Sequence, residues 1–122
     1  MAVIRLSATA QTDIAAVLAW TGTKFGLDAC RRYEALLTTA LQDLASDSTR
    51  RGTTTRPELG TNVFSYHLRH SRKRAGAAPG IARSPHHLLL YRVTPPGLVE
   101  IGRMLHDAME LERHLPDDFA GS

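Results

Sequence analysis

Residues 98–116 constrain the fold of this chain most, because they combine the pattern of a strand with the start of a helix. Val99 and Ile101 alternate with Glu and Gly, as in a strand with one buried face. Asp107 and Glu110 have the spacing of a capping box at a helix N-terminus. An apolar side follows, formed by Met109, Leu111 and Leu115. We therefore expect a final strand that leads into a short C-terminal helical turn.

Length and composition favour one small domain. The chain has 122 residues, of which 43% are hydrophobic, so a single core over residues 1–122 is expected. No apolar run approaches the length of a membrane helix, and the apolar run after Met1 is too short for a signal peptide. A single cysteine, Cys30, forms no internal disulfide, so we expect a cytoplasmic protein with no membrane partner.

Two helices are predicted in the first half of the chain, after a short strand over residues 2–6. Ser7 or Thr9 is a suitable N-cap for the first helix, which ends at Gly26 or earlier, near Thr21-Gly22. Its buried face would carry Ile14, Val17, Leu18 and Phe25, with Trp20 packing between the two helices. The second helix spans about residues 28–45, with a broad apolar stripe formed by Ala29, Tyr33, Leu36, Leu37, Ala40, Leu41 and Leu44.

The second half of the chain alternates loops and strands. Residues 46–60 have the composition of a loop, and residues 63–69 alternate as a strand with one apolar face. Residues 70–85 are basic and rich in small residues, which predicts a long, flexible connection. Residues 87–93 are apolar on both faces, as in a central strand, and a Pro-Pro-Gly turn joins them to the last strand. The expected fold is α+β in the order βααβββ, with a helical hairpin packed on a small, mainly antiparallel sheet.

Charge is unevenly distributed along the chain. Residues 59–99 contain six Lys or Arg, four His and no acidic residue, whereas residues 100–122 contain six acidic residues and two Arg. The basic middle suits a polyanion or an acidic protein surface, although for Arg72-Lys73-Arg74 alone a solvated loop is the favoured interpretation.

Metal binding and nucleophilic catalysis are not favoured by the spacing of the candidate residues. His67 and His70 lie three positions apart on an expected strand, so they cannot chelate a metal without a bulge, and the adjacent His86 and His87 also diverge. Cys30 lies beside the apolar stripe of a helix without a recognisable histidine partner. We therefore expect no metal site, no cofactor and no phosphate-binding loop.

Arg103 conflicts with the alternation of the last strand. Strict alternation places it on the same face as Ile101 and Leu105, which should be the core face. Either the strand passes the edge of the helical layer at Arg103, or a bulge redirects the side chain. Its role is then structural, through a pair with Asp107 or Glu110, or functional, as part of a surface that contacts a target.

Three stretches of the sequence resemble the ParE branch of the RelE/ParE toxins. The run Val-Glu-Ile-Gly-Arg-Met-Leu-His-Asp-Ala-Met-Glu-Leu-Glu-Arg-His-Leu-Pro at 99–116 is similar to their C-terminal signature, and His-His-Leu-Leu-Leu-Tyr-Arg-Val at 86–93 to their central strand. The helices agree at Ser7, Ala10, Asp13, Ile14, Phe25-Gly26, Ala29, Tyr33 and Leu36-Leu37. The basic connection at 70–85 is longer than is usual in that family.

This resemblance implies a toxin of a type II toxin–antitoxin pair that inhibits DNA gyrase by binding. It further implies neutralisation by a ParD-like antitoxin, through which alone the toxin would associate with DNA. Exposure and charge suggest target-binding residues Arg69, Arg92, Arg103 and His106. The apolar side chains suggested for antitoxin binding are Trp20, Tyr33, Leu37, Met109, Leu111 and Leu115.

Two alternatives remain. The RelE branch consists of ribosome-dependent mRNA endonucleases, and Arg103, His106 and Tyr91 could supply acid–base and charge-stabilising groups for such a reaction. The RelE arrangement of Lys, Arg and Tyr on one sheet face is not evident, so a non-enzymatic inhibitor is favoured. The second alternative is a degenerate, non-toxic module that retains only antitoxin binding.

Overall fold

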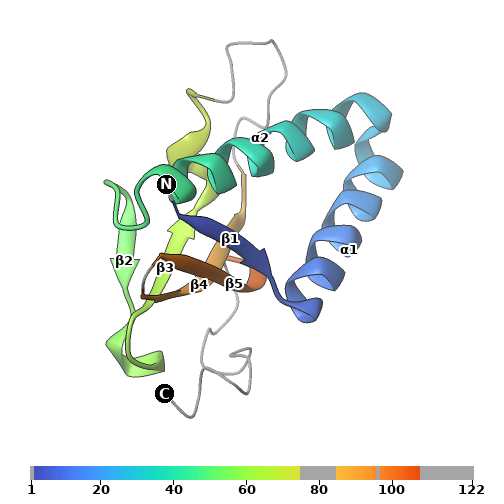
Figure 1. The fold of residues 1–122 in the computed structure, drawn as a ribbon. Coiled ribbons are helices and arrows are strands. Elements are labelled where there is room, and N and C mark those ends of the chain that lie inside the picture. The colour runs from blue at the N-terminus through green and yellow to red at the C-terminus, as the bar shows by residue number, and fades with distance from the viewer. Residues whose placement is uncertain (1, 75–84, 96, 108–122) are drawn as a thin grey trace.

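The computed structural model describes residues 2–74, 85–95 and 97–107, which form a helical hairpin and a five-stranded sheet (Figure 1). The helices are α1 (Ala8–Phe25) and α2 (Leu27–Ser46). The strands are β1 (Val3–Leu6), β2 (Thr53–Thr55), β3 (Val63–His67), β4 (His87–Thr94) and β5 (Leu98–His106). Two 3₁₀ turns, η1 (Pro57–Leu59) and η2 (Leu68–Ser71), flank β3. No helix among the described residues is long and apolar enough to cross a membrane.

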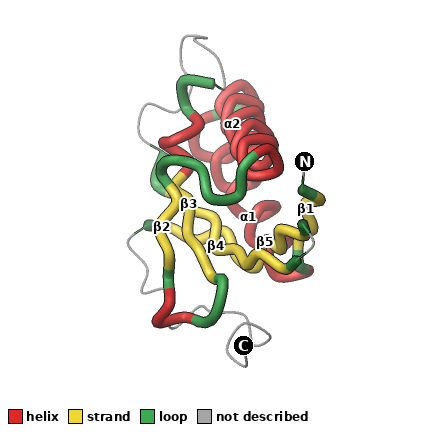
Figure 2. Tube along the Cα trace, turned by 60° about the vertical axis from the view of Figure 1, so that its left-hand side comes forward, coloured by secondary structure: helices red, strands yellow, loops and turns green. Residues whose placement is uncertain are grey.

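The sheet has the order β1-β5-β4-β3-β2, so β4 is the central strand, as the sequence predicts. The pairs β2–β3, β3–β4 and β4–β5 are antiparallel, whereas β1 runs parallel to β5. The sheet is therefore mixed and mainly antiparallel. The helices lie on one side of it (Figure 2), which confirms the predicted α+β architecture.

Residues at helix ends explain where α1 and α2 begin and end. The Ser7 hydroxyl oxygen accepts a hydrogen bond from the Ala10 amide (2.9 Å), which confirms Ser7 as the N-cap of α1. The same hydroxyl donates to the Gly102 carbonyl oxygen (2.9 Å) and thereby ties the start of α1 to β5. Gly26 separates the two helices with φ of 92°, a conformation that favours glycine, so the first helix runs to Phe25 and does not stop near Thr21-Gly22.

The main core lies between α2 and the sheet. The predicted stripe of α2 is largely buried, with Leu36, Ala40 and Leu44 fully inaccessible to solvent. It packs against the helix-facing residues of the sheet, Tyr66, Leu89, Tyr91, Val99, Ile101 and Met104. Burial of this apolar area is the main favourable contribution to folding. On the other face, Leu59, Val63 and Leu90 form a small second cluster beneath η1.

Two placements predicted for α1 are wrong. Phe25 was expected on the buried face of the helix, but its side chain is 67% exposed. Trp20 was expected between the helices, but it is 53% exposed and meets Phe25 edge to face, with ring centroids 5.7 Å apart. The reason is that the joint of the hairpin lies away from the sheet (Figure 1), so the last turns of α1 have no layer beneath them.

The segment predicted as a loop at 46–60 contains two elements, β2 and η1. β2 consists of three threonines, whose β-branched side chains suit an edge strand even though their polarity gives no alternating pattern. The strand predicted for 63–69 ends at His67, where η2 begins. The flexible connection predicted for 70–85 falls largely on residues 75–84, outside the described residues, as does the C-terminal helical turn.

A bulge in β5 resolves the conflict at Arg103. Leu90 is opposite Arg103 and Tyr91 is opposite Ile101, so Gly102 has no cross-strand partner. After the bulge Met104 faces the helices, and Arg103 lies on the face of Leu90. β1 ends at Leu6, and the Arg103 guanidinium reaches Asp13 of α1 there, with Nε–Oδ2 at 2.7 Å and Nη2–Oδ1 at 3.1 Å. Asp13 is therefore a structural partner of Arg103 that the sequence pattern does not predict, whereas Glu110, one of the two predicted partners, lies outside the described residues.

Candidate functional site

Histidines from β3, from β5 and from the position just before β4 converge on one carboxylate at the end of the sheet. Asp107 follows β5 directly, and its amide donates to the His86 carbonyl oxygen (2.8 Å). Its Oδ2 lies 2.9 Å from His67 Nε2 and 3.6 Å from His86 Nδ1, and its Oδ1 lies 3.4 Å from His106 Nδ1. We call Asp107, His67, His86 and His106 the histidine–aspartate cluster.

The hydrogen bonds of His67 define which of its ring nitrogens carries the proton. His67 Nδ1 accepts from the Arg69 amide (3.1 Å), so Nε2 is the protonated nitrogen and donates to Asp107. This hydrogen bond is the main reason that the pKa of Asp107 lies below its ordinary value, and the neighbouring imidazoles add to the effect. Asp107 is therefore an ionised acceptor held in a fixed orientation at neutral pH.

His87 faces the helices and is chemically distinct from the cluster. Burial, together with repulsion from His106, lowers the pKa of His87 to about 4, so its ring is neutral at pH 7. Burial also raises the pKa of Tyr33. The Tyr33 hydroxyl therefore stays protonated and can donate to His87 Nδ1, 2.6 Å away. This contact fastens α2 to β4, which is a structural role.

A shallow depression of about 440 Å³ opens beside the cluster. It is lined by His67, Arg69, His70, Arg72, Pro85, His86 and Asp107. Burial, together with the nearby Arg69, lowers the pKa of His70 and so disfavours a positive charge on this ring. The depression combines arginine side chains, imidazoles and one carboxylate, a mixture suited to polar contacts with a partner.

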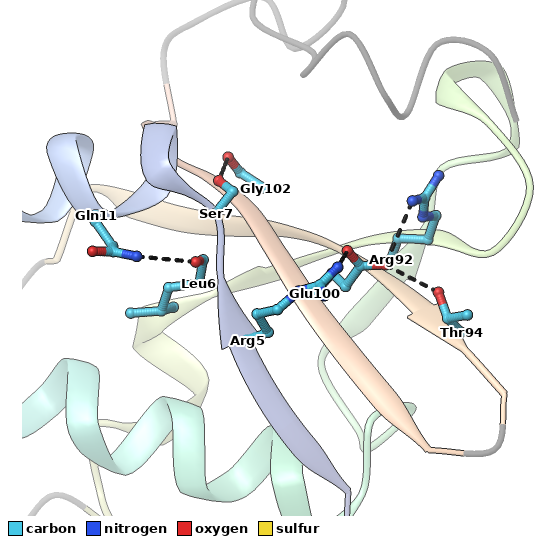
Figure 3. A network of polar contacts seen from close by, with 8 residues as sticks. All are labelled: Arg5, Leu6, Ser7, Gln11, Arg92, Thr94, Glu100 and Gly102. Atoms are coloured by element: carbon cyan, nitrogen blue, oxygen red, sulfur yellow. Dashed lines mark hydrogen bonds and ion pairs between the residues drawn. The ribbon is translucent and has the colours of Figure 1, made fainter.

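The face of the sheet away from the helices carries a second polar group, centred on Glu100 (Figure 3). Glu100 is paired with Arg5 on one side, and its Oε1 lies 3.5 Å from Arg92 Nη2 on the other. Thr94 Oγ1 donates to the same oxygen (3.2 Å). The hydrogen bond from Arg5 is the main cause that lowers the pKa of Glu100. Arg92, suggested as a target-binding residue, is thus held against an acidic neighbour.

The side chains suggested for target binding lie in different settings. Arg69 is exposed in η2 beside the depression, and His106 is 45% exposed at the end of β5. Arg92 and Arg103 are half-buried and engaged with Glu100 and Asp13 respectively. Arg69 and His106 are therefore the better placed to meet a partner.

The three residues that a nuclease would need do not converge. Tyr91 is fully buried on the helix face, and its hydroxyl donates to the Ser48 carbonyl oxygen (2.5 Å). Burial raises the pKa of this phenol. Arg103 projects from the opposite face of β5 and is paired with Asp13 of α1, and His106 is at the strand end. A common site for acid, base and phosphate stabilisation is therefore not formed by these residues.

The residues suggested for antitoxin binding are also separated by the fold. Tyr33 and Leu37 belong to the core, being 8% and 5% exposed, whereas Trp20 is exposed at the hairpin joint. There Phe25 and Leu27 are 67% and 63% exposed, so three large apolar side chains gather at the joint. We call Trp20, Phe25 and Leu27 the apolar tip. Met109, Leu111 and Leu115 lie outside the described residues.

From the sequence, only Trp20 of the apolar tip is suggested as a binding residue, and the histidine–aspartate cluster is not predicted. The sequence presents histidine pairs within single segments, whereas the cluster combines the end of β3, the residue before β4 and the end of β5. The antiparallel pairing of residues 87–93 with the last strand was a usable signal, because it brings His86 and His106 to the same sheet end.

The fold defines a class: small α+β proteins with a helical hairpin on one face of a mixed sheet. A family model described as the ParE toxin of the type II toxin–antitoxin system, parDE, matches residues 4–111. The chain therefore belongs to the ParE toxin family, and this membership implies an antitoxin partner. A comparison with curated proteins gave no match.

Proposed function

We propose that this toxin acts by binding DNA gyrase in the cytoplasm and that a ParD-like antitoxin neutralises it. Membership of the ParE family supports the proposal, since it makes the chain one half of a toxin–antitoxin pair. The observation that favours a binding mechanism over catalysis is that the candidate nuclease residues are separated. Tyr91 is buried, and Arg103 is paired with Asp13. Acid–base catalysis needs its groups within reach of one substrate.

The proposed target-binding surface is the exposed end of the sheet. Arg69 lines the depression, and His106 lies beside it next to Asp107. Arginine and histidine at such a position can form charge-assisted hydrogen bonds with an acidic protein surface. Arg92 and Arg103 serve this surface by holding β4 and β5 in place through Glu100 and Asp13.

The proposed antitoxin-binding surface is the apolar tip. Contiguous exposed apolar side chains commonly mark a protein interaction site, and aromatic residues are enriched where interfaces gain most of their affinity. An antitoxin segment that folds on binding would cover these side chains with an amphipathic helix. Tyr33 and Leu37 would contribute indirectly, by fixing α2 beneath the tip.

The target is tested by expressing the toxin with and without the reading frame encoded next to it, while following DNA supercoiling and mRNA integrity. We expect growth arrest with relaxed or broken DNA and intact mRNA, relieved by the neighbouring protein. Purified toxin should inhibit supercoiling by gyrase. Arg69→Ala should weaken that inhibition, whereas Arg31→Ala, which removes an exposed arginine of α2, should not. Arrest with cleaved mRNA would instead support a nuclease, and no arrest a degenerate antitoxin-binding module.

The antitoxin surface is tested by measuring the affinity of the purified pair. Truncating one well-packed aromatic side chain in an interface typically costs about 2 kcal/mol or more, which is roughly a 30-fold loss of affinity. We expect losses of that size for Trp20→Ala and Phe25→Ala. Val3→Ala is the matched control, because Val3 is 66% exposed but lies on β1. Equal affinities for all three variants would contradict the assignment.

A further inference from the structure

The histidine–aspartate cluster contains the parts of a metal site. His86, His106 and Asp107 each offer one ligand atom, and these atoms lie within 4.8 Å of one another. The ligands come from two adjacent segments of backbone, which the hydrogen bond from the Asp107 amide to the His86 carbonyl oxygen holds together. We propose that His86, His106 and Asp107 bind one Zn²⁺ ion, with a fourth coordination position open to solvent.

The distances suit this ion. Zinc binds histidine nitrogen at about 2.0–2.1 Å and carboxylate oxygen at about 2.0–2.2 Å in tetrahedral geometry, so neighbouring ligand atoms are separated by roughly 3.3–3.5 Å. His106 Nδ1 is 3.4 Å from Asp107 Oδ1, and His86 Nδ1 is 3.6 Å from the other carboxylate oxygen, Oδ2. One ligand atom from each residue lies within 4.8 Å of the other two, which is wider than the tetrahedral separation. Side-chain rotations must therefore draw the three ligand atoms together around the ion.

The ligand set selects the class of metal. Two imidazole nitrogens and one carboxylate oxygen match zinc and related divalent transition metals, whereas Ca²⁺ and Mg²⁺ require oxygen ligands. The arginines that line the depression, Arg69 and Arg72, oppose any cation. Binding therefore depends on strong coordination bonds and not on general negative charge, which again favours zinc over the hard cations.

His67 has the position of an orienting residue behind the ligands. Its Nε2 donates to Asp107 Oδ2 at 2.9 Å, and its own ring is fixed by the Arg69 amide. Carboxylate ligands of metal sites are commonly held by hydrogen bonds of this kind, and their loss costs about 10–100-fold in metal affinity. His70 lines the same depression and serves as a control.

The site would be open and would have a defined place in the fold. The side chains of His86, His106 and Asp107 are 61%, 45% and 34% exposed, so an ion can enter from solvent and keep a water molecule. The bound ion would link the beginning of β4 to the end of β5, beside the proposed target-binding residue Arg69. This inference does not depend on gyrase being the target.

The experiment titrates the metal-free full chain with Zn²⁺ alone and follows heat, stoichiometry and Tm. We expect one ion per chain and a rise in Tm that a chelator reverses, because a ligand that binds only the folded state stabilises it. His86→Ala and Asp107→Asn should abolish binding, His67→Ala should weaken it about 10–100-fold, and His70→Ala should leave it unchanged. Cys30→Ala and His114→Ala test two candidate ligands from other parts of the sequence and should also bind normally.

Two further measurements keep the inference falsifiable if a variant fails to fold. In the unaltered chain, Zn²⁺ should shift the NMR signals of the His86 and His106 rings before those of His70. Half an ion per chain, with dimer formation, would place the metal between two molecules and overturn the proposed site. Unchanged affinity in Asp107→Asn, or loss of binding in Cys30→Ala or His114→Ala, would overturn it as well.

Discussion

Asp43 provides the sharpest test of how this fold is held together. Its carboxylate is buried on α2 and accepts a hydrogen bond from the Ser71 hydroxyl (2.6 Å). Because Ser71 donates to Asp43, the Tyr66 hydroxyl must donate to Ser71 across 2.7 Å. The same carboxylate pairs with Arg50 and with Arg74, the latter with its Nε at 2.5 Å from Oδ1. Asp43→Ala would remove the final acceptor of this series of hydrogen bonds from Tyr66 through Ser71 to Asp43.

The expected cost follows from burial. Removing one partner of a buried ion pair typically costs about 3–5 kcal/mol, because the other groups stay buried and unsatisfied. Ser71 is fully buried, but the side chains of Arg50 and Arg74 are 26% and 62% exposed and can be rehydrated. We therefore expect the lower end, about 3 kcal/mol of unfolding free energy. At about 4 °C per kcal/mol this lowers Tm by roughly 12 °C.

Urea unfolding and thermal melts of the purified chain measure this cost. Asp43→Asn should lose less than Asp43→Ala, since the amide oxygen can still accept from Ser71. Glu34→Ala, which truncates an exposed side chain on the same helix, should change stability by less than about 0.5 kcal/mol. A loss below about 1 kcal/mol for Asp43→Ala would refute the argument, because it would mean that water replaces the carboxylate without penalty.

Three further results are expected. The hydrogen bond from Arg5 lowers the pKa of Glu100, so the ionised Glu100 stabilises the fold at pH values above the ordinary pKa of 4.5. This stabilisation is lost as the pH falls through the lowered pKa. Glu100→Gln should therefore flatten the acid side of a plot of stability against pH. Asp13→Ala should lower the free energy of unfolding by about 2–3 kcal/mol, because Asp13 accepts hydrogen bonds from Arg103 and from the Met104 amide. If Arg103 acts by docking α1, Asp13→Ala should also reduce toxicity as much as Arg103→Ala does. If Arg103 instead contacts the target, Asp13→Ala should remain toxic. Gly26→Ala should cost about 1–3 kcal/mol through its φ of 92°, even though an added Cβ meets no atom within 4 Å. A thermal melt equal to that of the unaltered chain would contradict this last expectation.

The sequence is sufficient to predict elements whose own pattern of apolar residues records which faces are buried. The stripe of α2 and the continuous apolar run of β4 each reflect the face or faces that they bury, so both could be predicted. β2 could not be predicted, because this edge strand of three threonines is positioned by its pairing with β3 and has no alternation of apolar and polar residues. The exposure of Trp20 and Phe25 depends on how far the hairpin extends beyond the sheet, which periodicity does not report.

The candidate site was less predictable than the fold because its members are distant in the sequence. His67 and Asp107 are 40 positions apart, and their contact requires the register of both antiparallel pairs. Arg103 could be recognised as misplaced from alternation alone, and the bulge at Gly102 was one of the two solutions considered. Its partner, 90 residues earlier in the chain, could not be deduced without the position of α1.

The parallel pairing of β1 with β5 has a consequence for how the protein is made. Arg5 meets Glu100, 95 residues later, so closing that loop costs about 4 kcal/mol by the logarithmic chain-entropy relation, against about 1.4 kcal/mol for the short turn between β4 and β5. Local contacts form fast and distant ones slowly. During synthesis the first strand leaves the ribosome long before its partner, and the sheet cannot be completed until residues 98–106 have emerged. The sheet of this toxin therefore waits for the synthesis of nearly all the residues that the structure describes.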